Sequence, residues 1–262
     1  MQPAQFKLLS VSRFILGSNP FSGFSHHSEE KDWEMRRYFS TNRIKQILFE
    51  AQDLGVNTFI ARTDFHVMRV FFEFQEDGGS IQWFAQTCPE VGSHQNCIQR
   101  ASDYGAKACH IHGGVMDNLY AQGKLDEIPP ALDMIREKGM LAGIAAHKPE
   151  VISWAEENLD VDYYLCSYYN PIPRDMNPEH VSGTDEIYLE QDRQTMTNLI
   201  PSLSKPAIHY KIMAAGRNDP HKAFAYAASK MRSNDAVCVG IYPKDNPNML
   251  RENIELLSKY LS

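Results

Sequence analysis

Residues 107–114, with the sequence KACHIHGG, indicate how the rest of the chain is arranged. Because side chains alternate along a strand, His110 and His112 lie on one face, and the pair Gly113-Gly114 lets the chain turn sharply where the strand ends. We interpret this stretch as the fourth of eight parallel strands in a closed barrel. His112 then stands at the mouth, where barrels of this kind carry their chemistry.

Seven other short apolar runs look like strands, and segments with helical periodicity separate them. The strands are expected at 13–19, 58–64, 81–88, 141–147, 163–170, 206–213 and 236–242. The helices are expected at 41–54, 66–75, 94–104, 126–138, 149–158, 188–203, 220–231 and 248–261. This strict alternation over 262 residues predicts an α/β fold, a (β/α)8 TIM barrel formed as one domain by residues 1–262. A doubly wound open sheet is the structural alternative.

Two connections are longer than a barrel normally needs, and we expect both to lie over the mouth. Residues 20–40 are either disordered or a functional lid, and aromatic residues such as Phe21, Phe24 and Trp33 favour the lid. Residues 171–187 are the second candidate lid.

Composition restricts the partners of the chain. The net charge is −7 with no basic block, which disfavours nucleic acid and anionic membrane surfaces as partners. We find no apolar run long enough for a membrane span and no signal-like N-terminus, and the five scattered cysteines predict reduced thiols. We therefore expect a cytoplasmic protein that binds a small molecule. The sequence leaves open whether the chain forms a homo-oligomer.

Polar residues at the carboxyl ends of the strands are the candidate site. We expect His112 and Asp64 to be acid/base catalysts, and Asn19, Arg62, Gln86, Tyr210 and Lys211 to bind substrate oxygens. Arg62 and Asp64 share a face, so a structural ion pair is the competing interpretation. Alternation along strand seven places Tyr210 on one face and Lys211 on the other, and the sequence leaves open which of them points inward.

Histidines that end neighbouring strands suggest a metal. His110, His112 and His147 would converge in one mouth and could hold zinc or another first-row divalent ion. No short metal-binding motif such as HExxH accompanies them, so this hypothesis depends on the strand order alone.

The second half of the chain resembles the aldo-keto reductases. The resemblance is carried by HKPEVISWAEE (147–157), YYNP (168–171) and VGIYPKDNPNMLRENIELL (239–257), and it covers about residues 107–260. It implies a barrel fold, assigns His112 to the catalytic histidine of the family, and places Glu252 and Asn253 near the adenine of NADP. In the first hundred residues only GVNTF (55–59) is similar.

The same resemblance shows that the hydride-transfer residues have changed. The family reduces carbonyls with an Asp, Tyr, Lys and His tetrad, and the first three positions fall here on Ile60, Phe65 and Thr87. The Ser-Asn pair that holds the nicotinamide becomes His147-Lys148. NADP is therefore less expected as a cofactor than a divalent metal.

These observations lead to three hypotheses. The first is a barrel enzyme, not a typical reductase, that acts on a sugar-like or hydroxy-acid-like metabolite as a lyase, hydrolase or isomerase, with or without a metal. The second is an NADP-dependent reductase with a displaced tetrad. The third is a non-catalytic barrel used for binding or sensing.

Overall fold

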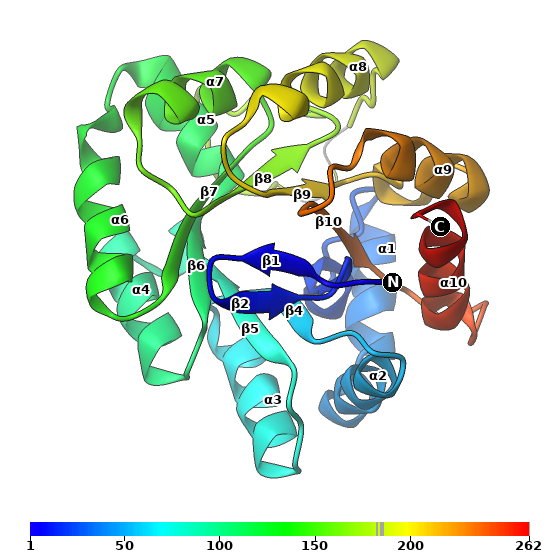
Figure 1. Cartoon of the computed structure of the whole chain (residues 1–262). Helices are drawn as coiled ribbons and strands as arrows, with labels where there is room; N and C mark the ends of the chain where they lie inside the picture. Colours follow the sequence, from blue (N-terminus) through cyan, green and yellow to red (C-terminus); the bar gives the residue numbers. More distant parts are fainter. Residues whose placement is uncertain (182, 184–185, 262) are drawn as a thin grey trace.

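The barrel is closed, so the predicted fold is confirmed and an open sheet is excluded. The computed structural model describes the whole chain except residues 182, 184–185 and 262. The parallel strands follow the order β10-β3-β4-β5-β6-β7-β8-β9 (Figure 1). They are β3 (Phe14–Gly17), β4 (Thr58–Arg62), β5 (Gln82–Gln86), β6 (Ala108–Ile111), β7 (Leu141–Ala146), β8 (Tyr163–Ser167), β9 (Ala207–Tyr210) and β10 (Ala236–Gly240). Closure joins β10 to β3, where Val237 pairs with Phe14 and Gly240 with Gly17.

The apolar runs form strands because both faces of the sheet are covered. Every residue of β3, β4, β6 and β8 is buried. Inward side chains such as Ile15, Phe84 and Ile208 fill the barrel, while outward ones such as Phe59 pack under the helices. Two-sided burial explains why these strands are continuous apolar runs without polar alternation.

A ring of helices surrounds the barrel (Figure 1). In the described residues these are α1 (Glu29–Tyr38), α2 (Thr41–Asp53), α3 (Phe65–Glu76), α4 (His94–Asp103), α5 (Gly113–Gln122), α6 (Ile128–Glu137), α7 (Pro149–Asn158), α8 (Glu190–Leu199), α9 (Pro220–Lys230) and α10 (Met249–Leu261). Several begin at a side-chain cap, as at Ser40, Ser93 and Asp219, whose oxygens accept a backbone N–H of the first turn. No described helix has both the length and the apolar character that crossing a membrane requires.

An N-terminal hairpin, which the sequence did not predict, closes the amino end of the barrel. It consists of β1 (Ala4–Phe6) and β2 (Leu9–Val11) and crosses the near end of the barrel in Figure 1. Phe6 is fully buried, with its ring 6.1 Å from that of Phe84 and 5.9 Å from that of Tyr163. The opposite end, at the carboxyl ends of the strands, is the open one.

Two helices differ from the predictions. Within residues 20–40, expected to be either disordered or a functional lid, the chain forms part of the 3-10 helix η1 (Asn19–Ser22) and then helix α1, which starts after its cap Ser28. The predicted sharp turn at Gly113-Gly114 is wrong: β6 ends at Ile111, His112 is the residue before the helix, and the two glycines form the first turn of α5.

Two further expectations concern the second candidate lid, residues 171–187, and the state of the cysteines. The described part of 171–187 lacks helix and strand, and the remainder of that candidate lid lies outside the described residues. All five cysteines are free thiols, as the sequence predicted.

Candidate functional site

A cavity of about 930 Å³ lies at the carboxyl ends of the barrel strands. Most of the predicted site residues line it, namely Asn19, Arg62, Gln86, His112, His147, Tyr210 and Lys211. His110 and Asp64 do not. The rule that barrels carry their sites at this end therefore located the cavity correctly from the sequence.

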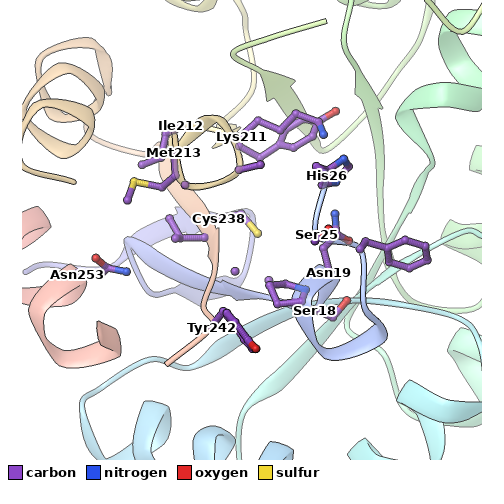
Figure 2. Close-up of a pocket in the computed structure, with 18 of the residues that line it drawn as sticks. Ser18, Asn19, Ser25, His26, Lys211, Ile212, Met213, Cys238, Tyr242 and Asn253 are labelled. Carbon is purple, nitrogen blue, oxygen red and sulfur yellow. The ribbon is translucent and has the colours of Figure 1, made fainter. Parts of the chain in front are cut away.

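The cavity has an arm that runs toward α10. Figure 2 shows Asn253 on that helix at one side, Cys238 and Tyr242 in the middle, and Lys211 and His26 beyond them. Residues of the barrel strands and residues of the C-terminal helix both line this arm. An elongated ligand could therefore reach from the mouth to α10.

His147 is held by a buried carboxylate. Its Nδ1 lies 2.7 Å from Oδ2 of Asp117, which is fully buried, and the carboxylate also accepts the backbone N–H of His147 at 3.2 Å. Burial lowers the pKa of His147, and the contact with Asp117 acts in the opposite direction. Because Nδ1–H of His147 donates to Asp117, Nε2 is the unprotonated ring nitrogen and can accept a proton from a molecule in the cavity.

The two glycines at the start of α5 leave room for this pair. A methyl group on Gly113 would stand 3.0 Å from the Tyr210 hydroxyl and 3.2 Å from Cε1 of His147. One on Gly114 would stand 2.4 Å from the carbonyl oxygen of Pro178, in the segment after β8. The glycines thus allow a close approach of side chains and backbone, which is a different role from the turn that was predicted.

His112 is a half-buried imidazole at the rim. Its backbone N–H donates to the Thr87 hydroxyl at 3.0 Å, and Nδ1 is buried without a partner among the described residues. Burial, reinforced by positive charge from His147 and Arg62, lowers the pKa of His112 well below its usual value. His112 can therefore offer a neutral ring to the cavity at pH 7.

His110 lies deeper, inside the barrel. Its Nδ1 is 3.2 Å from the Tyr163 hydroxyl, and burial lowers its pKa to about 3. Within the described part of the chain, His110, His112 and His147 do not form a cluster close enough to share an ion. The predicted metal set is thus not brought together, because His110 is one pleat below the rim.

Arg62 and Asp64 form the ion pair that was considered as the structural alternative. Nε of Arg62 lies 3.0 Å from Oδ2 of Asp64, and its Nη2 lies 3.1 Å from Glu90. The other oxygen of Asp64 caps α3 by accepting the N–H of Val67. With both oxygens occupied and outside the cavity lining, Asp64 positions Arg62 and α3, and we assign it no acid/base role.

Tyr210 and Lys211 both line the cavity, although strand alternation predicts opposite faces. Tyr210 points inward as the last residue of β9, and Lys211 then takes a left-handed conformation with φ of +58°, which redirects its side chain. Burial lowers the pKa of Lys211 to about 8. The Lys211 ammonium forms no hydrogen bond or ion pair with any described residue, and the charge of Glu186 acts on it only from a distance.

Two important residues, Asp117 and Arg174, were missed by sequence reasoning. Arg174 lines the cavity from the segment after β8 and forms no ion pair with a described side chain. The Asn118 side chain, next to Asp117 on α5, donates to the backbone carbonyls of Arg174 and Asp175 at 3.0 and 2.8 Å. The apolar spacing of Val115 and Leu119 is the signal that could have revealed α5.

The positions of the altered tetrad provide no replacement for the lost groups. Ile60 belongs to the apolar filling of the barrel, Phe65 is 65% exposed on α3, and Thr87 holds the backbone of His112. The tyrosines of the cavity, Tyr188, Tyr210 and Tyr242, all have a pKa raised above the usual value, mainly by burial. They are therefore weaker proton donors than an ordinary tyrosine.

Sequence comparison gives no relative. No protein-family model matches the chain, and no curated protein matches it either.

Comparison with solved structures shows the fold. A Pseudomonas aeruginosa protein assigned as an aldo-keto reductase has a TM-score of 0.67 and 14% identity, with 100% of this chain and 95% of that chain covered. An aldo-keto reductase from Bacillus halodurans in its holo form has a TM-score of 0.62 and 11% identity, covering 100% and 93% of the two chains. A truncated 3-deoxy-D-arabino-heptulosonate 7-phosphate synthase from Thermotoga maritima has a TM-score of 0.58 and 9% identity over 98% and 89%. The chain thus has the barrel fold of these aldo-keto reductases, at 11–14% sequence identity to them.

Proposed function

We propose that the protein is an enzyme that moves a proton on a small anionic metabolite, as a lyase or isomerase, with His147 as the general base. The observation that carries this proposal is the buried Asp117 that fixes His147 near two cations, Arg174 and Lys211, neither of which forms an ion pair with a carboxylate of the described residues. Buried positive charge is costly without an anion, so these cations favour a carboxylate or phosphate ligand.

The proposal gives a role to the two cations, to the His147–Asp117 pair and to His112. Arg174 and Lys211 bind the anionic group of the substrate. His147 Nε2 takes a proton from a carbon or hydroxyl group of the substrate, and Asp117 stabilises the imidazolium that forms. Neutral His112 donates a hydrogen bond to the oxygen on which negative charge develops. A hydrolase would use the same base on a water molecule.

The test is proton exchange in heavy water. A panel of keto acids, hydroxy acids and sugar phosphates is incubated with the protein, and loss of the C–H signals is followed by proton NMR. We expect exchange with a member of the panel, and a reduction of about 10²–10⁴-fold in His147→Asn. Inorganic phosphate binding, measured as a thermal shift, should survive His147→Asn but weaken in Lys211→Leu.

His66→Ala is the matched control, because His66 is an exposed histidine in the first turn of α3 and does not line the cavity. It should leave exchange unchanged. Exchange that is equally fast in His147→Asn would refute the proposal.

A second candidate is the NADP-dependent reductase, favoured by the cavity arm that reaches Glu252 and Asn253 on α10. In the family this region approaches the adenine. Titration with NADPH separates the two candidates: tight binding with a fluorescence change and carbonyl-dependent NADPH oxidation would favour the reductase. The raised pKa of each cavity tyrosine weighs against it.

A further inference from the structure

His26, His180 and Glu186 come together above the cavity from two segments that are far apart in sequence. His26 precedes α1, while His180 and Glu186 lie between β8 and α8. One potential ligand atom from each residue lies within 4.8 Å of the others. The rings of His26 and His180 are 5.0 Å apart, and Nδ1 of His26 is 2.6 Å from Oε1 of Glu186.

Three ring nitrogens of this cluster lack a hydrogen-bond partner among the described residues. Nε2 of His26 and both ring nitrogens of His180 are buried without a hydrogen bond among the described residues. Buried polar groups without partners are uncommon in native proteins and call for an explanation such as a bound ion. One nitrogen from each of the two histidines, together with the carboxylate of Glu186, provides three ligands for such an ion.

We propose that His26, His180 and Glu186 bind a first-row divalent metal ion, with zinc as the best match, at the rim of the cavity. Two imidazoles and one carboxylate are the ligand types of catalytic zinc and iron(II) sites, and hard ions such as magnesium prefer oxygen ligands throughout. Ligand atoms around a tetrahedral ion with bonds of about 2.1 Å stand about 3.4 Å apart, so only small shifts of the side chains are needed.

Surrounding residues orient the ligands. The Tyr188 hydroxyl donates to Oε2 of Glu186, and the carbonyl oxygen of His26 accepts a hydrogen bond from Arg217 at 2.9 Å. The ring of Phe24 packs edge-on against His180 with centroids 5.0 Å apart. Contacts outside the ligands commonly fix a metal site in this way.

The protonation state of the ligands also suits a metal. Burial lowers the pKa of His26 to about 4, so its ring is neutral at pH 7. Although burial alone raises the pKa of Glu186, the hydrogen bond with His26, the positive charge of Lys211 and the hydrogen bond from Tyr188 lower it to about 2. Neutral imidazole and ionised carboxylate are the forms that bind metals.

The ion would face the cavity, because His26 and His180 both line it. With three protein ligands, one coordination position stays open toward the bound molecule, as in catalytic zinc sites. The ion would also tie the two segments of the mouth together. This inference concerns metal binding and does not depend on the proposed proton transfer.

The test is zinc titration of tag-free, chelator-treated protein by calorimetry, with cobalt absorption as a second readout. We expect one zinc per chain, an affinity loss of about 100-fold or more in His180→Ala and in Glu186→Gln, and no change in His66→Ala. Because the Lys211 ammonium repels a cation nearby, Lys211→Leu should bind zinc about tenfold more tightly. Circular dichroism and thermal unfolding establish that each variant is folded.

Three results would overturn the proposal. They are absence of zinc binding at about 100 µM metal, full zinc affinity in both ligand variants, and loss of zinc in His112→Ala with retention in His180→Ala. The last result would place the ion on the histidines of the barrel strands instead.

Discussion

At the scale of single residues, Asp117 has the largest effect on the candidate site. Its carboxylate accepts hydrogen bonds from the ring and the backbone of His147 and from the backbone N–H of Lys148. A neutral amide in its place would keep the shape but would no longer stabilise an imidazolium.

We predict that Asp117→Asn slows the proton exchange described above by about 10²–10⁴-fold with little change in phosphate binding. Since Asp117 raises the pKa of His147 against the effect of burial, the acidic limb of the pH–rate profile should move to lower pH in the variant. The profile is measured by NMR exchange rates in wild type and variant. An unchanged limb would show that another group accepts the proton.

At the scale of elements, helix α5 connects the base to the loop that covers the mouth. Asp117 holds His147 at the end of β7, and its neighbour Asn118 holds the backbone at Arg174. Both ends of the candidate site therefore depend on the placement of one helix.

We predict that Asn118→Asp, which keeps the size but loses both donated hydrogen bonds, loosens residues 171–179. Two such bonds contribute about 1–3 kcal/mol locally, so amide exchange in this segment should become about tenfold faster or more, while global stability changes less. Hydrogen exchange with mass spectrometry measures the effect. Asn158→Asp is the matched control, because its side chain bonds only within α7, to Trp154. Equal exchange in the two variants would contradict the role given to Asn118.

The elements also show what a sequence can and cannot predict here. All eight barrel strands lie within the predicted runs, because two-sided burial produces apolar stretches that are visible without a structure. Helix α5 was missed because Gly113 and Gly114 look like a break, and only contacts from Tyr210 and Pro178 explain them.

In the candidate site, the residues at strand ends were predictable from the sequence, whereas those that come from helices and loops elsewhere in the chain were not. His112 and His147 follow from the rule about strand ends, whereas Asp117, Arg174 and His180 reach the mouth from a helix and a loop. Lys211 shows a further limit of sequence-based prediction. Strand alternation puts Lys211 and Tyr210 on opposite faces, but the left-handed conformation of Lys211, with φ of +58°, brings both side chains to the cavity.

At the scale of the whole molecule, several buried histidines stay neutral in the folded protein. Burial lowers the pKa of His110 to about 3, and it also lowers the pKa of His112 and His147. In the unfolded chain each of these groups titrates near its usual value of about 6.5. Below that pH the unfolded state binds more protons, so acid should favour unfolding.

We predict that the free energy of unfolding decreases as the pH falls from about 6.5 toward 4, with His110 alone contributing a slope of about 1.4 kcal/mol per pH unit. His110→Asn, which cannot titrate in this range, should reduce the slope by about that amount. Urea unfolding at several pH values in the presence of a chelator measures both slopes. Identical slopes would mean that His110 is protonated in the folded barrel.

The N-terminal hairpin also affects how a ligand can enter and leave the protein. Because Phe6 packs against Phe84 and Tyr163 at the amino end, and side chains fill the barrel behind them, the described residues leave no route between the cavity and that end. A molecule in the cavity must therefore enter and leave at the carboxyl ends of the strands. The segments that carry His26 and Arg174 line the cavity at that end, so their positions affect both entry and departure.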